Sequence, residues 1–197
     1  MKFLFTILFL SAAIGLNAQK PLDGLQEQFT HYTQLVKDGE FDKALDYSPE
    51  KIFTIVPRSA LIKAMESTMN DPEMEFAFFL PAYVSFEMPF EDQGIKYQVF
   101  YYKQRMTLKF IAEPEDGETQ EIVDFSNNLR LELFKDVYGE DNVSFNAETQ
   151  IYDVNVEKKA LAIHEESAAH LHFAVLEEDK KELMKRIFSN KVINKIY

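Results

Sequence analysis

The stretch IKYQVFYYKQRMTLKF, residues 95–110, is the clearest β-strand in the sequence and decides its fold class. Side chains of a strand point alternately to its two faces. One face of this stretch is apolar (Phe100, Tyr102, Met106, Leu108, Phe110). The other face carries Tyr97, Val99, Tyr101, Lys103, Arg105 and Lys109. The alternation predicts a strand with one face on a core and the other face outward.

The residues before this strand predict helices followed by short strands. Apolar residues recur at helical spacing in 21–39, a second short helix fits 40–47, and a third fits 58–69. Ser48-Pro49 opens a turn between the second and third helices. The segment EFAFFLPAYVSFEMPF, 75–90, is aromatic and β-prone, although its two prolines limit central pairing.

The residues after the strand predict one more helix between strands and a helix at the end of the chain. The helix runs from about Thr119 to Tyr138, and its apolar stripe is Ile122, Phe125, Leu129, Leu133 and Val137. A strand at 143–157 changes its alternation, which predicts a bulge or bend at 146–151. Strands at 159–165 and 170–178 follow, and Asp179 is expected to cap a last helix that runs through 196.

Helices on one face of a bent antiparallel sheet define an α+β domain. Three segments, VKDGEFDKALDY (36–47), YSPEKIFTIVPRSALIKAM (47–65) and VYGEDNVSFNAETQIYDV (137–154), carry a family resemblance. The chain resembles the cone-shaped NTF2-like (SnoaL-like) superfamily and a group of exported bacterial proteins of unknown function. The helix at 119–138, between strands, departs from the usual order of that superfamily. The resemblance implies isomerases, dehydratases and non-enzymatic binding modules alike, so it fixes no chemistry.

The N-terminus MKFLFTILFLSAAIGLNAQK has the layout of a secretory signal peptide. Lys2 is its positive region, 3–14 is its apolar run, and 15–18 offers small residues for cleavage. We expect a signal peptide at 1–18, a single domain at 19–197, and a periplasmic or secreted protein. The chain has no Cys, which excludes a lipoprotein anchor and disulfides.

The composition of the chain indicates which classes of partner are not expected. Acidic residues number 33 against 21 basic ones, for a net charge of −12. A surface this negative repels phosphate backbones and anionic headgroups, so nucleic acid and membrane surfaces are not expected partners. With 18 Phe and 9 Tyr the chain has ample apolar side chains for a core.

Three of the four histidines lie in HEESAAHLH, residues 164–172. His164 and His170 are six residues apart, so they cannot share a helix face as the HExxH zinc motif requires. In a hairpin that pairs Leu161 and Ile163 with Leu171 and Phe173, the imidazoles of His164, His170 and His172 all project from the face away from the core. They would then be close enough to hold a zinc or copper ion. The alternative is a solvated sheet face.

A second candidate surface is the row Tyr97, Tyr101, Lys103 and Arg105 on the outward face of the long strand. Aromatic and cationic residues together suit an anionic ligand, an acidic protein partner or a homodimer contact. The alternative is an ordinary solvent face. A further possibility is an acid–base pair of His31 with Asp46 or another carboxylate.

No nucleophile motif, glycine-rich phosphate loop or catalytic residue stands out, and no cofactor is expected beyond the zinc or copper ion. Two functions remain. The first is an exported non-enzymatic binding module, with a small apolar molecule or a protein partner on the concave sheet face. The second is a SnoaL-like acid–base enzyme of isomerase or dehydratase type, which needs a His or carboxylate buried in a pocket.

Overall fold

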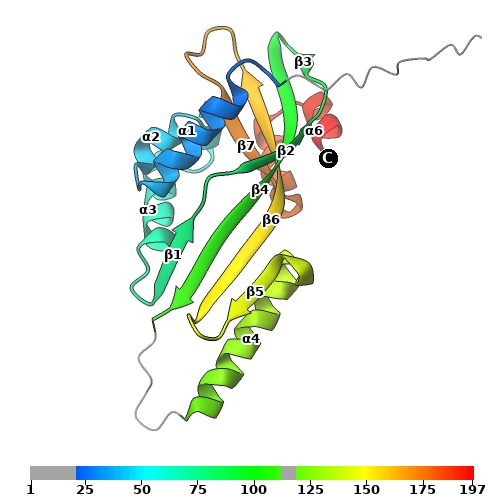
Figure 1. The fold of residues 1–197 in the computed structure, drawn as a ribbon. Helices are drawn as coiled ribbons and strands as arrows, with labels where there is room; N and C mark the ends of the chain where they lie inside the picture. Colours follow the sequence, from blue (N-terminus) through cyan, green and yellow to red (C-terminus); the bar gives the residue numbers. More distant parts are fainter. Residues whose placement is uncertain (1–20, 112–118) are drawn as a thin grey trace, which may run out of the picture.

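A computed structural model describes residues 21–111 and 119–197 (Figure 1). The protein is an α+β protein with N-terminal helices, a seven-stranded antiparallel sheet, one helix between strands, and C-terminal helices. The expected signal peptide at 1–18 lies outside the described residues. None of the helices in the described ranges is long and apolar enough to cross a membrane.

Two long strands form the middle of the sheet. They are β4 (Ile95–Phe110), which confirms the predicted strand, and β6 (Ile151–His164), and they pair from Lys96↔His164 to Leu108↔Tyr152. The sheet is not strongly curled. The other edge of β4 pairs with β1 (Met74–Phe78), β2 (Ala82–Phe86) and β3 (Phe90–Asp92), and the other edge of β6 pairs with β5 (Val143–Asn146) and β7 (His172–Leu176).

The single strand predicted at 143–157, with a bulge or bend at 146–151, is wrong. Residues 147–150 form a turn that ends β5 and starts β6, with Asn146 opposite Ile151. The change in alternation therefore marks the junction of two strands in a hairpin. Gln150 has a φ of 59°, in the left-handed region that tight turns often need.

Of the N-terminal helices, α1 covers one face of the sheet. Helix α1 (Leu25–Lys37) lies across this face, next to α2 (Phe41–Leu45), and α3 (Arg58–Met69) follows (Figure 1). The periodicity of α1 puts Leu25 and Phe29 into the core. There they pack with an aromatic group from the sheet: Phe100, Tyr102 and Phe173, with Ala160, Ala162 and Leu171.

The C-terminal helices cover the opposite face, so the centre of the sheet is buried on both sides. They are α5 (Lys181–Ile187) and α6 (Asn190–Ile196), not the single helix predicted. The helix breaks because Phe188 is extended, and the Ser189 hydroxyl then caps α6 by accepting from Val192 N at 3.3 Å. This core contains Tyr97, Val99, Leu161, Ile163, Ala174, Leu176, Met184, Ile187, Val192, Ile193 and Ile196.

Helix α4 (Gln120–Tyr138) packs at the far end of the sheet, beside β5 (Figure 1). It matches the helix predicted at 119–138 to within one residue. Its inner face contributes Leu131, Phe134 and Tyr138 to a third cluster around Val143 and Val154. The buried Tyr152 hydroxyl donates to Asn127, whose backbone and side-chain oxygens lie at 3.0 and 3.1 Å.

We expect Tyr152→Phe to lower the free energy of unfolding by about 1–3 kcal/mol, because it removes the donor facing the buried Asn127 oxygens. Urea unfolding followed by circular dichroism should show a lower midpoint with an unchanged slope. An unchanged midpoint would show that this hydrogen bond does not help to hold α4.

Candidate functional site: a pocket beside β7

The segment after α2 crosses the outer edge of β7 and builds one wall of a pocket. Phe173 N donates to Tyr47 O at 2.7 Å, which fixes the segment to the strand. The 3₁₀ helix η1 (Glu50–Thr54) continues toward the C-terminal helices, where Lys51 Nζ lies 3.4 Å from Ile187 O. A hollow is left between η1, the loop at 165–171 and the end of α5.

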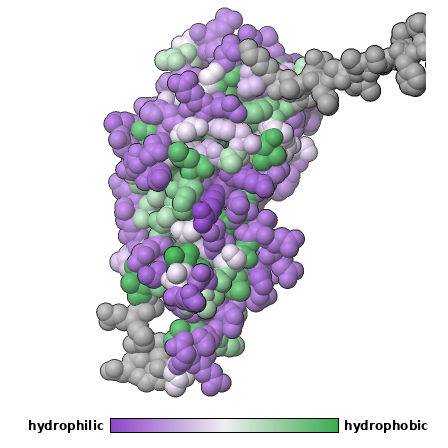
Figure 2. Space-filling model, viewed as in Figure 1, coloured by the Kyte–Doolittle hydropathy of each residue, from purple (hydrophilic) through white to green (hydrophobic). Residues whose placement is uncertain are grey.

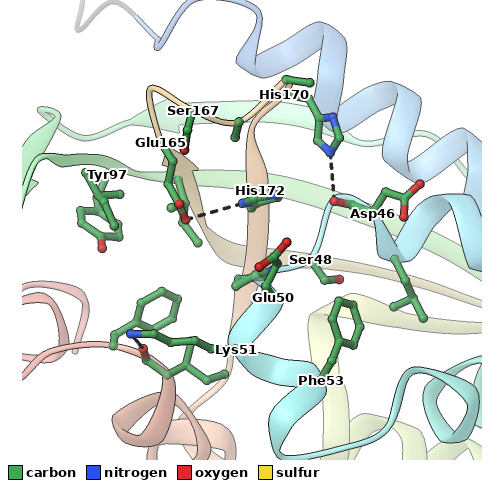
Figure 3. A pocket seen from close by; sticks show the side chains of 18 of the residues that line it. Asp46, Ser48, Glu50, Lys51, Phe53, Tyr97, Glu165, Ser167, His170 and His172 are labelled. Carbon is green, nitrogen blue, oxygen red and sulfur yellow. Dashed lines mark hydrogen bonds and ion pairs between the residues drawn. The ribbon is translucent and has the colours of Figure 1, made fainter.

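This pocket has a volume of about 840 Å³ and a mixed lining (Figure 3). Its size lies within the usual range for sites of small molecules. The apolar part of the lining includes Leu45, Phe53, Ile95, Tyr97, Ile163, Ile187 and Phe188. The polar part includes Asp46, Ser48, Glu50, Lys51, Arg58, Glu165, Ser167, His170 and His172.

Among the polar residues of this lining, His172 contains a buried atom without a hydrogen-bond partner. Its side chain is 13% exposed, and its Nδ1 atom is buried without a hydrogen bond. The nearest carboxylate oxygen is Glu165 Oε1 at 3.9 Å, beyond hydrogen-bonding distance (Figure 3). Burial lowers the pKa of His172 below 6.5, against the opposing pull of Glu165. The imidazole is therefore neutral at pH 7.

His170 stands next to it and is held in place. Its Nε2 donates to Asp46 O at 3.0 Å, and its ring packs on Tyr47 with centroids 4.6 Å apart. The rings of His170 and His172 are perpendicular, with centroids 5.6 Å apart. His170 thus joins the loop at 165–171 to the segment that crosses β7.

The predicted hairpin register is wrong, and His164 is separated from the other two histidines. Ile163 pairs with His172 and Ala162 pairs with Phe173, so odd residues of β6 face even residues of β7. His164 therefore lies on the α1 face of the sheet, opposite to His172. The apolar pattern predicted the wrong register because Leu161, Ala162 and Ile163 are all buried, although consecutive residues point to opposite faces of the sheet.

The zinc or copper hypothesis required all three imidazoles on one face of the sheet. In this register they are not on one face. Within 21–111 and 119–197, no group of three or more His, Cys, Asp or Glu side chains is arranged to hold a metal ion. His164 does not line the pocket that His170 and His172 share.

The row Tyr97, Tyr101, Lys103 and Arg105 does not face outward as a whole. Tyr97 is only 6% exposed and packs edge-on against Phe188. Tyr101 is half-buried and donates to Glu87 Oε1 at 2.8 Å; burial, together with this carboxylate, raises its pKa to about 12. The C-terminal helices cover this half of the strand, so the prediction that Tyr97 and Tyr101 face outward is wrong.

Lys103 and Arg105, beyond the C-terminal helices, are exposed as predicted. Arg105 is paired with Asp153 at 2.5 Å and stacks over Phe79 at 4.6 Å. Its charge is thus already matched within the chain, which weakens this surface as an anion site.

The pair of His31 and Asp46 is also not formed. Asp46 accepts from Arg58 at 2.7 Å, whereas His31 is exposed and packs its ring near Tyr47 at 5.9 Å. The sequence reasoning missed Glu165 and Glu50, which lie near His172 in the pocket. The position of Glu165 within the histidine-rich stretch at 164–172 was the available signal.

No protein-family model matches the chain, and no curated protein matches its sequence. The described residues show an α+β protein with N-terminal helices and a seven-stranded antiparallel sheet.

Proposed function

We propose that this chain is an exported, non-enzymatic binding module for a small molecule with an apolar body and a cationic or hydrogen-bond-donating group. The pocket beside β7 is the binding site. The observation that carries the proposal is the buried, unpartnered Nδ1 atom of His172 in a pocket of ligand size.

An unpartnered buried polar atom costs about 1–3 kcal/mol. A ligand group that hydrogen-bonds to His172 Nδ1 recovers this energy, so the atom favours an occupied pocket. Because Nδ1 is buried in the unliganded pocket, the side chains around it must move slightly when the ligand binds. The apolar body of the ligand has Tyr97, Phe188 and Phe53 to pack against. Few other polar atoms are needed to orient a ligand that is held this way.

The carboxylates near His172 select the polar group of the ligand. Of the two cations in the lining, Arg58 is paired with Asp42 and Asp46, and Lys51 Nζ lies 3.4 Å from Ile187 O. Glu165 and Glu50 both act on the imidazole and favour positive charge there. A carboxylate ligand would be repelled by both, whereas an ammonium can donate to neutral Nδ1 and lie near Glu165. The net charge of −12 also attracts cations to the protein.

The expected concave-face site is replaced by this pocket. The sheet face toward α1 is filled by Phe29, Phe100, Tyr102 and Phe173, and these aromatic contacts support a packed core there. The resemblance to the NTF2-like superfamily remains a proposal, supported by the N-terminal helices and the antiparallel sheet.

Three probes with one ring and different polar groups test the proposal: benzylamine, benzyl alcohol and benzoate. Calorimetry at about pH 7.5 should give benzylamine a dissociation constant on the order of 1 mM, with benzoate at least roughly tenfold weaker. His172→Phe should weaken benzylamine binding by about tenfold, because it removes the acceptor. The matched control His164→Phe should bind as the parent does.

Binding should also weaken as the pH falls. Protonated His172 cannot accept a hydrogen bond at Nδ1, and it repels the ammonium. Because burial lowers the pKa of His172 below its ordinary value, benzylamine should bind at pH 7 and lose affinity as the pH falls through that lowered pKa. Equal affinities for benzylamine and benzoate, or no effect of His172→Phe, would contradict the proposal.

A second candidate function is acid–base catalysis in the same pocket. It is favoured by one observation: His172 is neutral at pH 7 and has a carboxylate, Glu165, 3.9 Å away. Under this function the protein should speed the exchange of α-hydrogens of cyclopentanone in D₂O beyond an equal concentration of free imidazole. His172→Phe should abolish the excess rate, and the absence of any excess rate would leave the binding module alone.

A further inference from the structure

Helix α4 exposes its main apolar stripe. Ile122, Phe125, Leu129, Leu133 and Val137 are between 47% and 72% exposed, although they form the stripe that amphipathic periodicity assigns to a core. The helix is instead held by a different face, through Leu131, Phe134 and Tyr138. It therefore has two apolar faces, and within residues 21–111 and 119–197 only one of them is packed against the protein.

The stripe runs the length of the helix. Its residues are spaced three, four, four and four apart, which at 100° per residue keeps them within about 120° of the helix circumference. Uncharged Ser126 lies within the stripe near its centre, and Asp136 is the charged residue within it, near its C-terminal end. A centre depleted of charge is typical of an interface core.

The area of the stripe suits a dimer. Five side chains of this size, half to three-quarters exposed, present on the order of 500 Å² of apolar surface. A standard interface covers about 800 Å² per partner, and about 65% of a homodimer interface is apolar, which is about 520 Å². The stripe alone supplies this apolar area.

We infer that α4 pairs with α4 of a second copy of this chain, so that the two stripes bury each other. A two-fold interface uses the same patch on both copies, and a straight apolar ridge is complementary to itself. With Leu129 near the axis and the helices antiparallel, Phe125 of one copy lies against Leu133 of the other. This contact is remote from the pocket beside β7 and does not depend on its ligand.

The charges next to the stripe argue against a membrane surface. Helices that lie on membranes carry Lys and Arg along their polar face. Here Glu121 and Glu132 border one side of the stripe and Asp136 lies within it, whereas Arg130, on the other side, is stacked over Phe110 at 4.6 Å. Lys135 is already paired with Glu132 at 2.9 Å. Hydrophilic side chains also predominate on the face of the protein shown in Figure 2.

The salt dependence of binding distinguishes self-association from the docking of a cationic partner. Two copies with a net charge of −12 repel each other, so screening should strengthen the dimer. A cationic partner would instead bind more weakly as salt is added.

Sedimentation velocity of the purified protein at about 50 mM and about 0.5 M NaCl tests the inference. We expect a concentration-dependent dimer that is stronger at the higher salt. The double variant Phe125→Ser with Leu129→Ser should weaken the dimer at least about 100-fold and keep its fold, because both side chains are exposed. The matched control is Val84→Ser with Met88→Ser, two exposed apolar residues on and beside β2, which should leave the dimer unchanged.

A single cysteine gives a second readout that does not require a disruptive change. The chain has no Cys, so Leu129→Cys adds one thiol at the expected axis, and mild oxidation should link two copies through it. The control Met88→Cys should stay monomeric under the same oxidation. A monomer at all concentrations and salts, a dimer unaffected by the double variant, or a dimer weakened by salt would each overturn the inference.

Discussion

Replacing Phe29 by Ala should lower the melting temperature of the protein by about 10 °C. Phe29 is 1% exposed, and its ring lies edge-on to Phe100, Tyr102 and Phe173 at 4.9, 4.9 and 5.0 Å. Truncating a buried Phe to Ala costs about 3–5 kcal/mol, because the burial is lost and a cavity remains. In a domain of this size each kcal/mol shifts the melting temperature by about 2–4 °C.

The control for this prediction is Met88→Ala, at a position that is 64% exposed. Its effect should stay within about 0.5 kcal/mol. Differential scanning calorimetry of both variants gives the comparison. A shift of less than about 3 °C for Phe29→Ala would show that the aromatic cluster does not carry the packing of α1 on the sheet.

Removing α6, residues 190–197, should abolish cooperative folding. The helix buries Val192, Ile193 and Ile196 against the sheet face opposite α1. Each buried aliphatic side chain contributes about 1.5–3 kcal/mol. Deletion also opens the core beneath it, so the loss approaches the whole stability of a typical domain, about 5–15 kcal/mol.

Near-ultraviolet circular dichroism during heating measures this effect, because it reports fixed aromatic packing. The truncated chain should show no cooperative transition. The milder variant Ile196→Ala should lose about 2–5 kcal/mol, and Lys195→Ala, at an exposed position of the same helix, should change little. A cooperative transition near the parental temperature in the truncated chain would contradict the second core.

The α+β class and most of the elements follow from local pattern. The strand at 95–110 and the helices near 58–69 and 119–138 were predicted because each is long and strongly patterned. The break between α5 and α6 was not predicted, because Phe188 and Ser189 fit a helical pattern and only the capping geometry shows the break.

The directions of the side chains were predicted less well, for a physical reason. Alternation identifies a single core face only when the other face meets solvent. Here α1 covers one side of β4 and β6 while α5 and α6, distant in the chain, cover the other. Tyr97 was therefore predicted outside and is buried, and the register of His172 was shifted by one residue.

The same reasoning explains why the pocket could be predicted only in part. Two of its histidines stand out in the sequence, but the walls come from four separate parts of the chain: 45–58, 95–97, 163–172 and 187–188. No local pattern indicates that the chain after α2 crosses the edge of β7. The exposure of the α4 stripe could not be predicted from the sequence either, because the periodicity of the stripe is the same as that of a buried helix face.

The central claim is that the pocket beside β7 holds a ligand through His172, and nuclear magnetic resonance of the benzylamine complex tests it most directly. In ¹⁵N-labelled protein, benzylamine should move the His172 Nδ1 resonance, and its ring protons should show contacts to Tyr97 and Phe188, which line the pocket. The His164 ring, on the opposite sheet face, should be unaffected. Contacts only with Lys103 or Arg105, or an unchanged His172 resonance at saturation, would contradict the account.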